Sequence, residues 1–300
     1  MGISLPGNRV DLAHVSRGAG GRPEVHALVS YRRERPAEEA LAILRRQHGL
    51  ARHRCATVLG AGEYQMLQLE APEVPRGEVK DAVRWRVKDM IDYPPESATI
   101  DLVEIPASPE GGTRARGLHV FCARNEVIGA RMKLFDGAKV PLEAIDVPEM
   151  ALRNVAALWA GPKRALALIA FDETGGTLVI VAGGELYASR RIEATEGDLS
   201  DPDEASRQPH LERIALELQR SFDYYDRQFG SAPLEKLVVA APRAAELADY
   251  LRPILYVPVE AADLGAVMDF PAVPELRDPA RQAQCLVTLG LALRGEEAAP

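Results

Sequence analysis

The strands and helices that hydrophobic periodicity predicts follow a similar order twice along this 300-residue chain. Residues 1–61 and 141–160 have the pattern of three strands, a helix, a strand, and then a further strand and helix. Residues 161–294 begin with a three-strand meander, after which helices and strands alternate. Pattern alone predicts an α/β or α+β protein. Gly161-Pro162 marks the boundary between the two halves.

Residues 62–140 interrupt the first half with a module of their own. Its predicted elements are strands at Tyr64–Glu70, Thr99–Ile105 and Leu118–Ala123 and helices at 79–92 and 125–135. In the second half, the acidic stretch 195–209 is predicted to be a loop. The elements predicted after this loop are a core-facing helix at 210–229, a strand at Ile254–Val257 and a final helix at 279–294.

Two residues do not fit the helix predicted at 79–92. Its apolar stripe consists of Val79, Val83, Val87, Met90 and Ile91, and Tyr93-Pro94-Pro95 ends it. Arg86 falls inside this stripe, whereas Trp85 falls on the opposite, charged face. A buried arginine needs an acidic partner, and an exposed tryptophan often marks a partner surface. The alternative is that Arg86 extends its guanidinium to solvent and Trp85 packs on a neighbouring strand.

Composition narrows the functional classes. The net charge of −8 disfavours nucleic acid as a ligand, and 47% apolar with 27% charged residues is typical of a globular protein. The chain contains neither a signal-peptide pattern nor an apolar run of 18 residues, which predicts a cytoplasmic protein that reaches a membrane only through a partner. Its three separated cysteines predict buried, reduced thiols.

Catalytic motifs give no support for an enzyme. The sequence contains no G-x-x-x-x-G-K-[ST], H-E-x-x-H or G-x-S-x-G pattern. The six histidines are scattered, and only His48 and His53 are close in sequence, at a spacing that does not suit a metal pair. We therefore expect no metal site and no catalytic residue.

Four stretches carry a family resemblance. They are AVRWRVKDMIDYPPESATIDL (82–102), AIDVPEMALRNVAAL (144–158), LERIALELQRSFDYYDRQF (211–229) and CLVTLGLALR (285–294). Together they resemble the MshI/PilM group, actin-like assembly proteins of type IV pili and type II secretion machines. This group includes proteins of MSHA (mannose-sensitive haemagglutinin) pili and is related to the cytoplasmic domain of GspL-type secretion proteins.

The resemblance implies an α/β, actin-like (FtsA/PilM-type) fold with two lobes. Residues 1–61 and 141–160 would form the first lobe, and the last helix, 279–294, would pack back on it. Residues 62–140 would be a small α+β subdomain inserted in that lobe. Residues 161–278 would form the second lobe, with a reduced outer subdomain.

Actin-like enzymes hold a nucleotide between their lobes with two glycine-rich hairpin loops, and this sequence departs from both. In the first loop, with the family pattern D-x-G-[ST], Ser4 replaces the carboxylate while Gly7 follows Pro6. In the second loop, one register places Ala170 at the family's aspartate. A shorter register places Asp172 there, followed by Gly175-Gly176.

The glycine pair near the adenosine also differs, because this chain has Ala240-Ala241 followed by Pro242. Alanine and proline do not adopt the positive φ that glycine allows. We therefore expect a pseudo-ATPase without a cofactor. The alternative is an ATPase switch that binds Mg-ATP through Gly7, Asp172, Gly175 and Gly176. A filament-forming relative of division proteins is a third possibility.

Partners follow from the resemblance as well. In PilM-type relatives, a short N-terminal cytoplasmic peptide of a PilN-type inner-membrane protein docks between the first lobe and its inserted subdomain. The resemblance implies that this chain binds a PilN/MshJ-like protein in the same way, at the inner membrane. We expect Trp85, Arg86, Tyr93 and Asp101 near the partner surface. An assembly ATPase is a further candidate partner.

Overall fold

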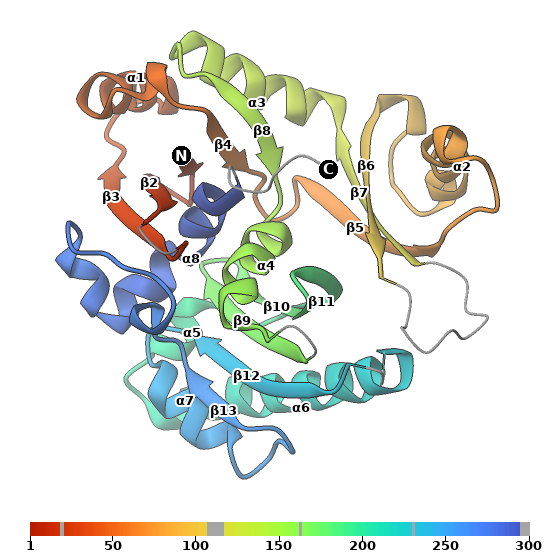
Figure 1. Cartoon of the computed structure of the whole chain (residues 1–300), viewed down its shortest axis with the longest axis vertical. Helices are drawn as coiled ribbons and strands as arrows, with labels where there is room; N and C mark the ends of the chain where they lie inside the picture. Colours follow the sequence, from red (N-terminus) through yellow and green to blue (C-terminus); the bar gives the residue numbers. More distant parts are fainter. Residues whose placement is uncertain (19–20, 107–116, 162–163, 230–231, 295–300) are drawn as a thin grey trace.

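The computed structural model describes residues 1–18, 21–106, 117–161, 164–229 and 232–294. Three sheets organise these residues, two of five strands and one of three (Figure 1). Most of the loop predicted between the strands at 99–105 and 118–123 lies outside the described residues, as does Pro162. No helix within the described ranges is long and apolar enough to span a bilayer.

The first sheet has the strand order β3-β2-β1-β4-β8. Its strands are β1 (Gly2–Ser4), β2 (Arg9–Arg17), β3 (Pro23–Arg32), β4 (Cys55–Val58) and β8 (Leu142–Asp146). The first three strands pair antiparallel, whereas β4 pairs parallel with both β1 and β8. Helices α1 (Ala37–His48) and α3 (Asn125–Gly137) pack with this sheet in one core that contains Ile3, Leu12, Leu44 and Phe135.

The second sheet repeats this topology, with the order β11-β10-β9-β12-β13. Its strands are β9 (Ala165–Asp172), β10 (Gly175–Ala182), β11 (Glu185–Ile192), β12 (Leu234–Ala240) and β13 (Val259–Ala261). Helices α6 (Glu204–Phe229) and α7 (Ala244–Leu251) pack against it in a second core. The repeated topology confirms the predicted two-lobe α/β fold.

Two helices lie between the lobes. Helix α4 (Pro148–Trp159) contacts β9, β10 and β11 of the second sheet, and α8 (Pro279–Leu293) contacts β1, β2 and β4 of the first sheet as well as β9 and β12 of the second (Figure 1). The two helices also contact each other so closely that a Cβ added at Gly290 would lie 2.0 Å from the carbonyl oxygen of Ala151. At the end of α8, Arg294 pairs with the buried carboxylate of Asp146 at 2.5 Å.

The third sheet, β5-β7-β6, is inserted after β4. It consists of β5 (Tyr64–Glu70), β6 (Ala98–Ile105) and β7 (Gly117–Arg124), and α2 (Val79–Arg86) packs on one face. The boundary differs from the predicted 62–140. Residues of α3 and the turn after it, such as Phe135 and Val140, belong to the core of the first sheet. The inserted module therefore ends near Arg124.

Helix α2 is shorter than predicted. It ends at Arg86 and continues as a 3₁₀ turn over Val87–Asp89, so its buried stripe is Val83, Val87 and Ile91. Met90 is 44% exposed. Because the stripe is narrower than expected, Arg86 lies outside it, which agrees with the alternative in which its guanidinium extends to solvent. Arg86 is exposed and donates a hydrogen bond to the backbone carbonyl of Glu70 at 2.9 Å.

Two predictions in the second lobe also need correction. The stretch 195–209 is partly helical, because α5 (Glu196–Ser200) begins with a capping box between Thr195 and Asp198. Helix α6 begins at Glu204 and includes Pro209 in its second turn. The strand predicted at Ile254–Val257 occurs later, as β13.

Candidate functional site: an interlobe cleft and an adjoining groove

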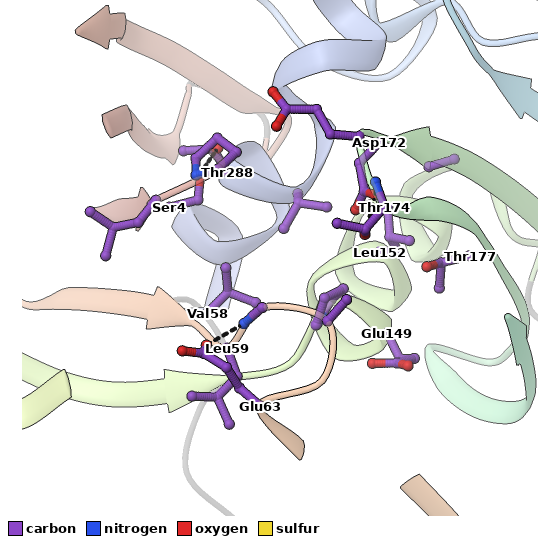
Figure 2. Close-up of a pocket in the computed structure, with 18 of the residues that line it drawn as sticks. Ser4, Val58, Leu59, Glu63, Glu149, Leu152, Asp172, Thr174, Thr177 and Thr288 are labelled. Atoms are coloured by element: carbon purple, nitrogen blue, oxygen red, sulfur yellow. Dashed lines mark hydrogen bonds between the residues drawn. The ribbon is translucent and has the colours of Figure 1, made fainter. Parts of the chain in front are cut away.

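A cleft of about 690 Å³ lies between the two lobes (Figure 2). Most of the described lining comes from five segments. They are the β1–β2 turn (Ser4–Gly7), the segment Val58–Tyr64, the start of α4 (Pro148, Glu149, Leu152), the β9–β10 turn (Ala170–Thr174) and α8 (Ala283, Gln284, Val287, Thr288). Ligands of α/β proteins commonly bind at the carboxyl ends of parallel strands, which makes this cleft a candidate site.

Acidic side chains outnumber basic ones around the cleft. The described lining includes the carboxylates of Glu63, Glu149, Asp172, Glu173 and Glu196 and the guanidinium groups of Arg9, Arg131 and Arg191. All three arginines pair with carboxylates of the chain, namely Asp11 at 3.6 Å, Glu63 at 2.7 Å and Asp172 at 3.7 Å, respectively. The described lining therefore carries more negative than positive charge, and its arginines are already paired within the chain.

The β9–β10 turn reaches across the cleft to the first lobe. Asp172 accepts hydrogen bonds from the backbone nitrogen of Thr174 at 2.7 Å and from its hydroxyl at 2.5 Å, which fixes the turn. The Glu173 carboxylate lies against Gly7, where an added Cβ would be 2.5 Å from Oε2. Gly7 also has φ +46°, so its backbone conformation favours glycine, whereas the Glu173 carboxylate is the end of a flexible side chain that could move aside.

The residues predicted for nucleotide loops are only partly brought together. Ser4, Gly7, Ala170 and Asp172 line the cleft. The Ser4 hydroxyl shares a hydrogen bond of 2.7 Å with the hydroxyl of Thr288 (Figure 2). The other four predicted residues, Gly175, Gly176, Ala240 and Ala241, are not among the described lining residues.

Local packing explains the positions of these four residues. A Cβ at Gly176 would lie 2.7 Å from the Phe171 ring, and one at Gly175 would lie 2.9 Å from the carbonyl oxygen of Ile192. The glycine pair is thus used for close packing in the sheet. Ala240 and Ala241 are each 1% exposed.

Sequence analysis missed one buried polar contact at the cleft. Glu149, the second residue of α4, is 7% exposed and accepts a hydrogen bond from the Tyr64 hydroxyl at 2.6 Å. Burial is the main cause that raises the pKa of the Glu149 carboxyl, and the hydrogen bond from Tyr64 opposes this shift. The signal in the sequence was a glutamate at the helix start that directly follows a parallel strand.

A second cavity, a groove of about 300 Å³, separates the inserted module from the first lobe. Strands β6 and β7 form one wall, and α3 and β8 form the other. The polar lining includes Tyr64, Thr99, Asp101 and Glu143. The rest of the described lining is Leu59, Phe121, Cys122, Ala123, Ile128, Met132, Leu142, Ala144, Ile145 and Val147. Met132 is 57% exposed, so a large apolar side chain is accessible in the groove.

The four residues predicted at a partner surface do not form one site. Asp101 lines the groove. Trp85 is 69% exposed but belongs to α2, which packs on the face of the inserted sheet formed by Ile100 and Val120. Tyr93 is 9% exposed and belongs to this same core, with the Arg124 guanidinium 4.2 Å from its ring centre. Because Asp101 alternates with Ile100 along β6, it points to the other face.

Comparison with solved structures defines the class of protein. No protein-family model matches the sequence, and no curated protein matches it significantly. A Bacteroides thetaiotaomicron protein described as having an actin-like ATPase fold and unknown function matches with a TM-score of 0.51 and 7% identity, over 89% of this chain and 91% of that one. The chain has an actin-like fold.

Within this class, a pilus assembly protein gives a higher TM-score. The PilM-PilN type IV pilus biogenesis complex matches over 99% of this chain and 98% of that one, with a TM-score of 0.74 and 22% identity. The cytoplasmic domain of EpsL, an inner-membrane component of the Vibrio cholerae type II secretion system, matches over 94% and 92%, with 10% identity and a TM-score of only 0.48. The resemblance to PilM-type proteins is thus confirmed in the fold.

Proposed function

We propose that this chain is a non-catalytic scaffold for the assembly of a type IV (MSHA-like) pilus or a type II-like secretion machine. It binds the N-terminal cytoplasmic peptide of a PilN/MshJ-like inner-membrane protein, and this contact holds it at the cytoplasmic side of the inner membrane. Similarity in fold to the PilM-PilN type IV pilus biogenesis complex supports the class of partner.

The groove between the inserted module and the first lobe is the observation that carries this proposal. Strand β8 is the last strand of the first sheet, and its residues 142–145 line the groove. An extended peptide can add backbone hydrogen bonds to such a strand, while apolar side chains enter pockets beside it. Ile128 and Met132 of α3 and Phe121 of β7 provide apolar surface for those side chains.

The polar residues at the rim of the groove indicate which side chains of the peptide it would favour. The Asp101 side chain is 85% exposed and pairs weakly with Lys80, at 3.9 Å. Glu143 lies on the β8 side and is already paired with Arg54. Asp101 is therefore available for a basic or hydrogen-bond-donating group of the peptide.

The cleft supports the non-catalytic part of the proposal. Its three lining arginines are paired within the chain, and Ser4 occupies the position where the resemblance expects a carboxylate. The second candidate function is a Mg-ATP switch in the same machinery. It is favoured by the 690 Å³ volume of the cleft and by the positive φ of Gly7 in the β1–β2 turn.

Isothermal titration with the N-terminal peptide of the candidate membrane partner tests the proposal. Met132→Glu places a charge in the groove and should weaken peptide binding at least tenfold, about 1.4 kcal/mol. Met90→Glu is the matched control, because Met90 is a similarly exposed methionine that does not line the groove in the described structure. Equal affinity of the two variants would rule out this groove as the binding site.

The same instrument distinguishes the two candidate functions. Peptide binding without heat of Mg-ATP binding supports the scaffold. Micromolar binding of Mg-ATP would instead support the nucleotide switch, and the arginine pairs of the cleft would then have to open.

A further inference from the structure

The cleft and the groove share a wall. Leu59 and Tyr64 line both cavities, so each of these side chains can contact a ligand in the cleft or in the groove. Tyr64 is the first residue of β5, and it approaches the first lobe where Leu59 follows β4. A change in the groove that moves the Tyr64 ring therefore reaches the cleft through a single side chain.

The hydroxyl of Tyr64 is fixed on the cleft side. It donates to Oε2 of Glu149 at 2.6 Å, a short bond between residues that are 85 positions apart in sequence. Glu149 is 7% exposed and lies in the first turn of α4, which packs between the lobes. Losing the donor would leave a buried carboxyl group without its tyrosine partner, which is costly in this environment.

The inserted sheet also contacts the second lobe. Gln68, on the same strand and face as Tyr64, accepts a hydrogen bond from the Tyr224 hydroxyl of α6 at 3.3 Å. Ile105, at the end of β6, is buried in the core of the second lobe. The sheet thus contacts the second lobe as well as the first.

We propose that Tyr64 couples the groove to the interlobe cleft: an occupant that displaces the Tyr64 ring breaks its hydrogen bond to Glu149 and changes the separation of the lobes. Tyr64 acts as a positioning residue in this coupling. The identity of the natural occupant as a peptide rests on the proposed function, but the coupling itself does not, because any group that fills the groove should produce it.

The test measures the distance between the lobes with spin labels. Gln47→Cys on α1 and Asp223→Cys on α6 supply exposed labelling positions on different lobes. The native cysteines Cys55, Cys122 and Cys285 are buried, so the labels should react at the introduced sites. The probe of the groove is Met132→Trp, which fills it from within and needs no peptide.

In the labelled protein, Met132→Trp should shift the mean interlobe distance by about 2 Å or more. Tyr64→Phe keeps the ring but removes the hydroxyl, so by itself it should shift the distance in the same direction, and Met132→Trp should add nothing further to it. An unchanged distance in Met132→Trp would overturn the proposal, and so would an unchanged distance in Tyr64→Phe or a second full shift when the two substitutions are combined. Should Met132→Trp fail to fold, Ile128→Trp fills the same groove and has the same expected outcome.

The peptide gives an independent arm of the test. Peptide binding to the protein without groove substitutions should produce the same shift. Tyr64→Phe should bind the peptide within about threefold of wild type, and binding should not change its interlobe distance further. Failure of the peptide to bind, together with a shift in Met132→Trp, would refute the proposed function while it supports the coupling. A further peptide-induced shift in Tyr64→Phe, as large as the one in wild type, would refute the coupling alone.

Discussion

Gly290→Ala should destabilise the protein by preventing α8 from packing on α4. Gly290 lies inside α8, and its added methyl group would be 2.0 Å from the carbonyl oxygen of Ala151 and 2.6 Å from the carbonyl carbon. Both are backbone atoms of α4, so no side-chain rotation relieves the overlap. The helices must separate by more than 1 Å to reach ordinary contact.

Three contributions set the magnitude. Overpacking of a well-packed core costs about 1–3 kcal/mol. Separation of the helices also stretches the hydrogen bond from Asn154 Nδ2 to the Gly290 carbonyl, which is 3.0 Å long and contributes about 1 kcal/mol. The higher helix propensity of alanine relative to glycine offsets about 0.5–1 kcal/mol of this loss. The net expected loss in the free energy of unfolding is about 1–3 kcal/mol.

Urea unfolding followed by circular dichroism measures this loss. Gly129→Ala is the matched control, because Gly129 lies in α3 and an added Cβ would meet no atom within 4 Å. This control should gain about 0.5–1 kcal/mol. A Gly290→Ala variant that is as stable as wild type, or that gains as much as Gly129→Ala, would refute the close packing of α8 on α4.

Three further predictions address the surface, the buried histidine and the cleft. Trp85→Ala should change peptide affinity less than twofold, because Trp85 lies across the inserted sheet from the groove; a tenfold loss in titration would show that the partner also covers α2. His119 is buried, and this burial is the main reason that its pKa is lowered to about 4. The unfolded chain therefore binds a proton at this histidine more readily than the folded chain does. Because of this difference, the free energy of unfolding should fall as the pH falls from about 6.5 towards 4. The free energy of unfolding, measured in urea at pH 7 and at pH 4.5, should differ between these pH values by about 2 kcal/mol less in His119→Phe than in wild type. The same pH dependence in both proteins would contradict the prediction. Millimolar Mg-ATP should leave the melting temperature unchanged. If Mg-ATP did bind, a concentration of 100 times its Kd would stabilise the folded protein by about 2.7 kcal/mol, and the melting temperature would rise.

Much of the fold was predictable because local signals agreed with the tertiary structure. The apolar stripe of α6 around Ile214, Leu218 and Phe222 is buried as its spacing predicts. Where the prediction failed, a local feature was overlooked. The capping box of Thr195 and Asp198 starts a helix inside a stretch whose acidic and proline content indicated a loop. The 3₁₀ turn after Arg86 narrows the buried stripe of α2.

The candidate sites were much less predictable. Sequence reasoning selected Trp85 because it did not fit its helix face, and its exposure is confirmed, but a groove is a property of two surfaces. Asp101 lines the groove, whereas Phe121 and Met132 were not selected. A single exposed methionine on a helix is a common observation and does not reveal which strand faces it.

The sequence by itself determined the order of strands and helices, because periodicity, capping and turn residues act among neighbours in the chain. These signals led to the two lobes, the inserted module and the resemblance to PilM-type proteins. Only the tertiary structure decided which distant residues meet. Tyr64 reaches Glu149 across 85 positions, and Gly290 contacts Ala151. Such contacts depend on how whole elements pack, and no short stretch of sequence records that geometry.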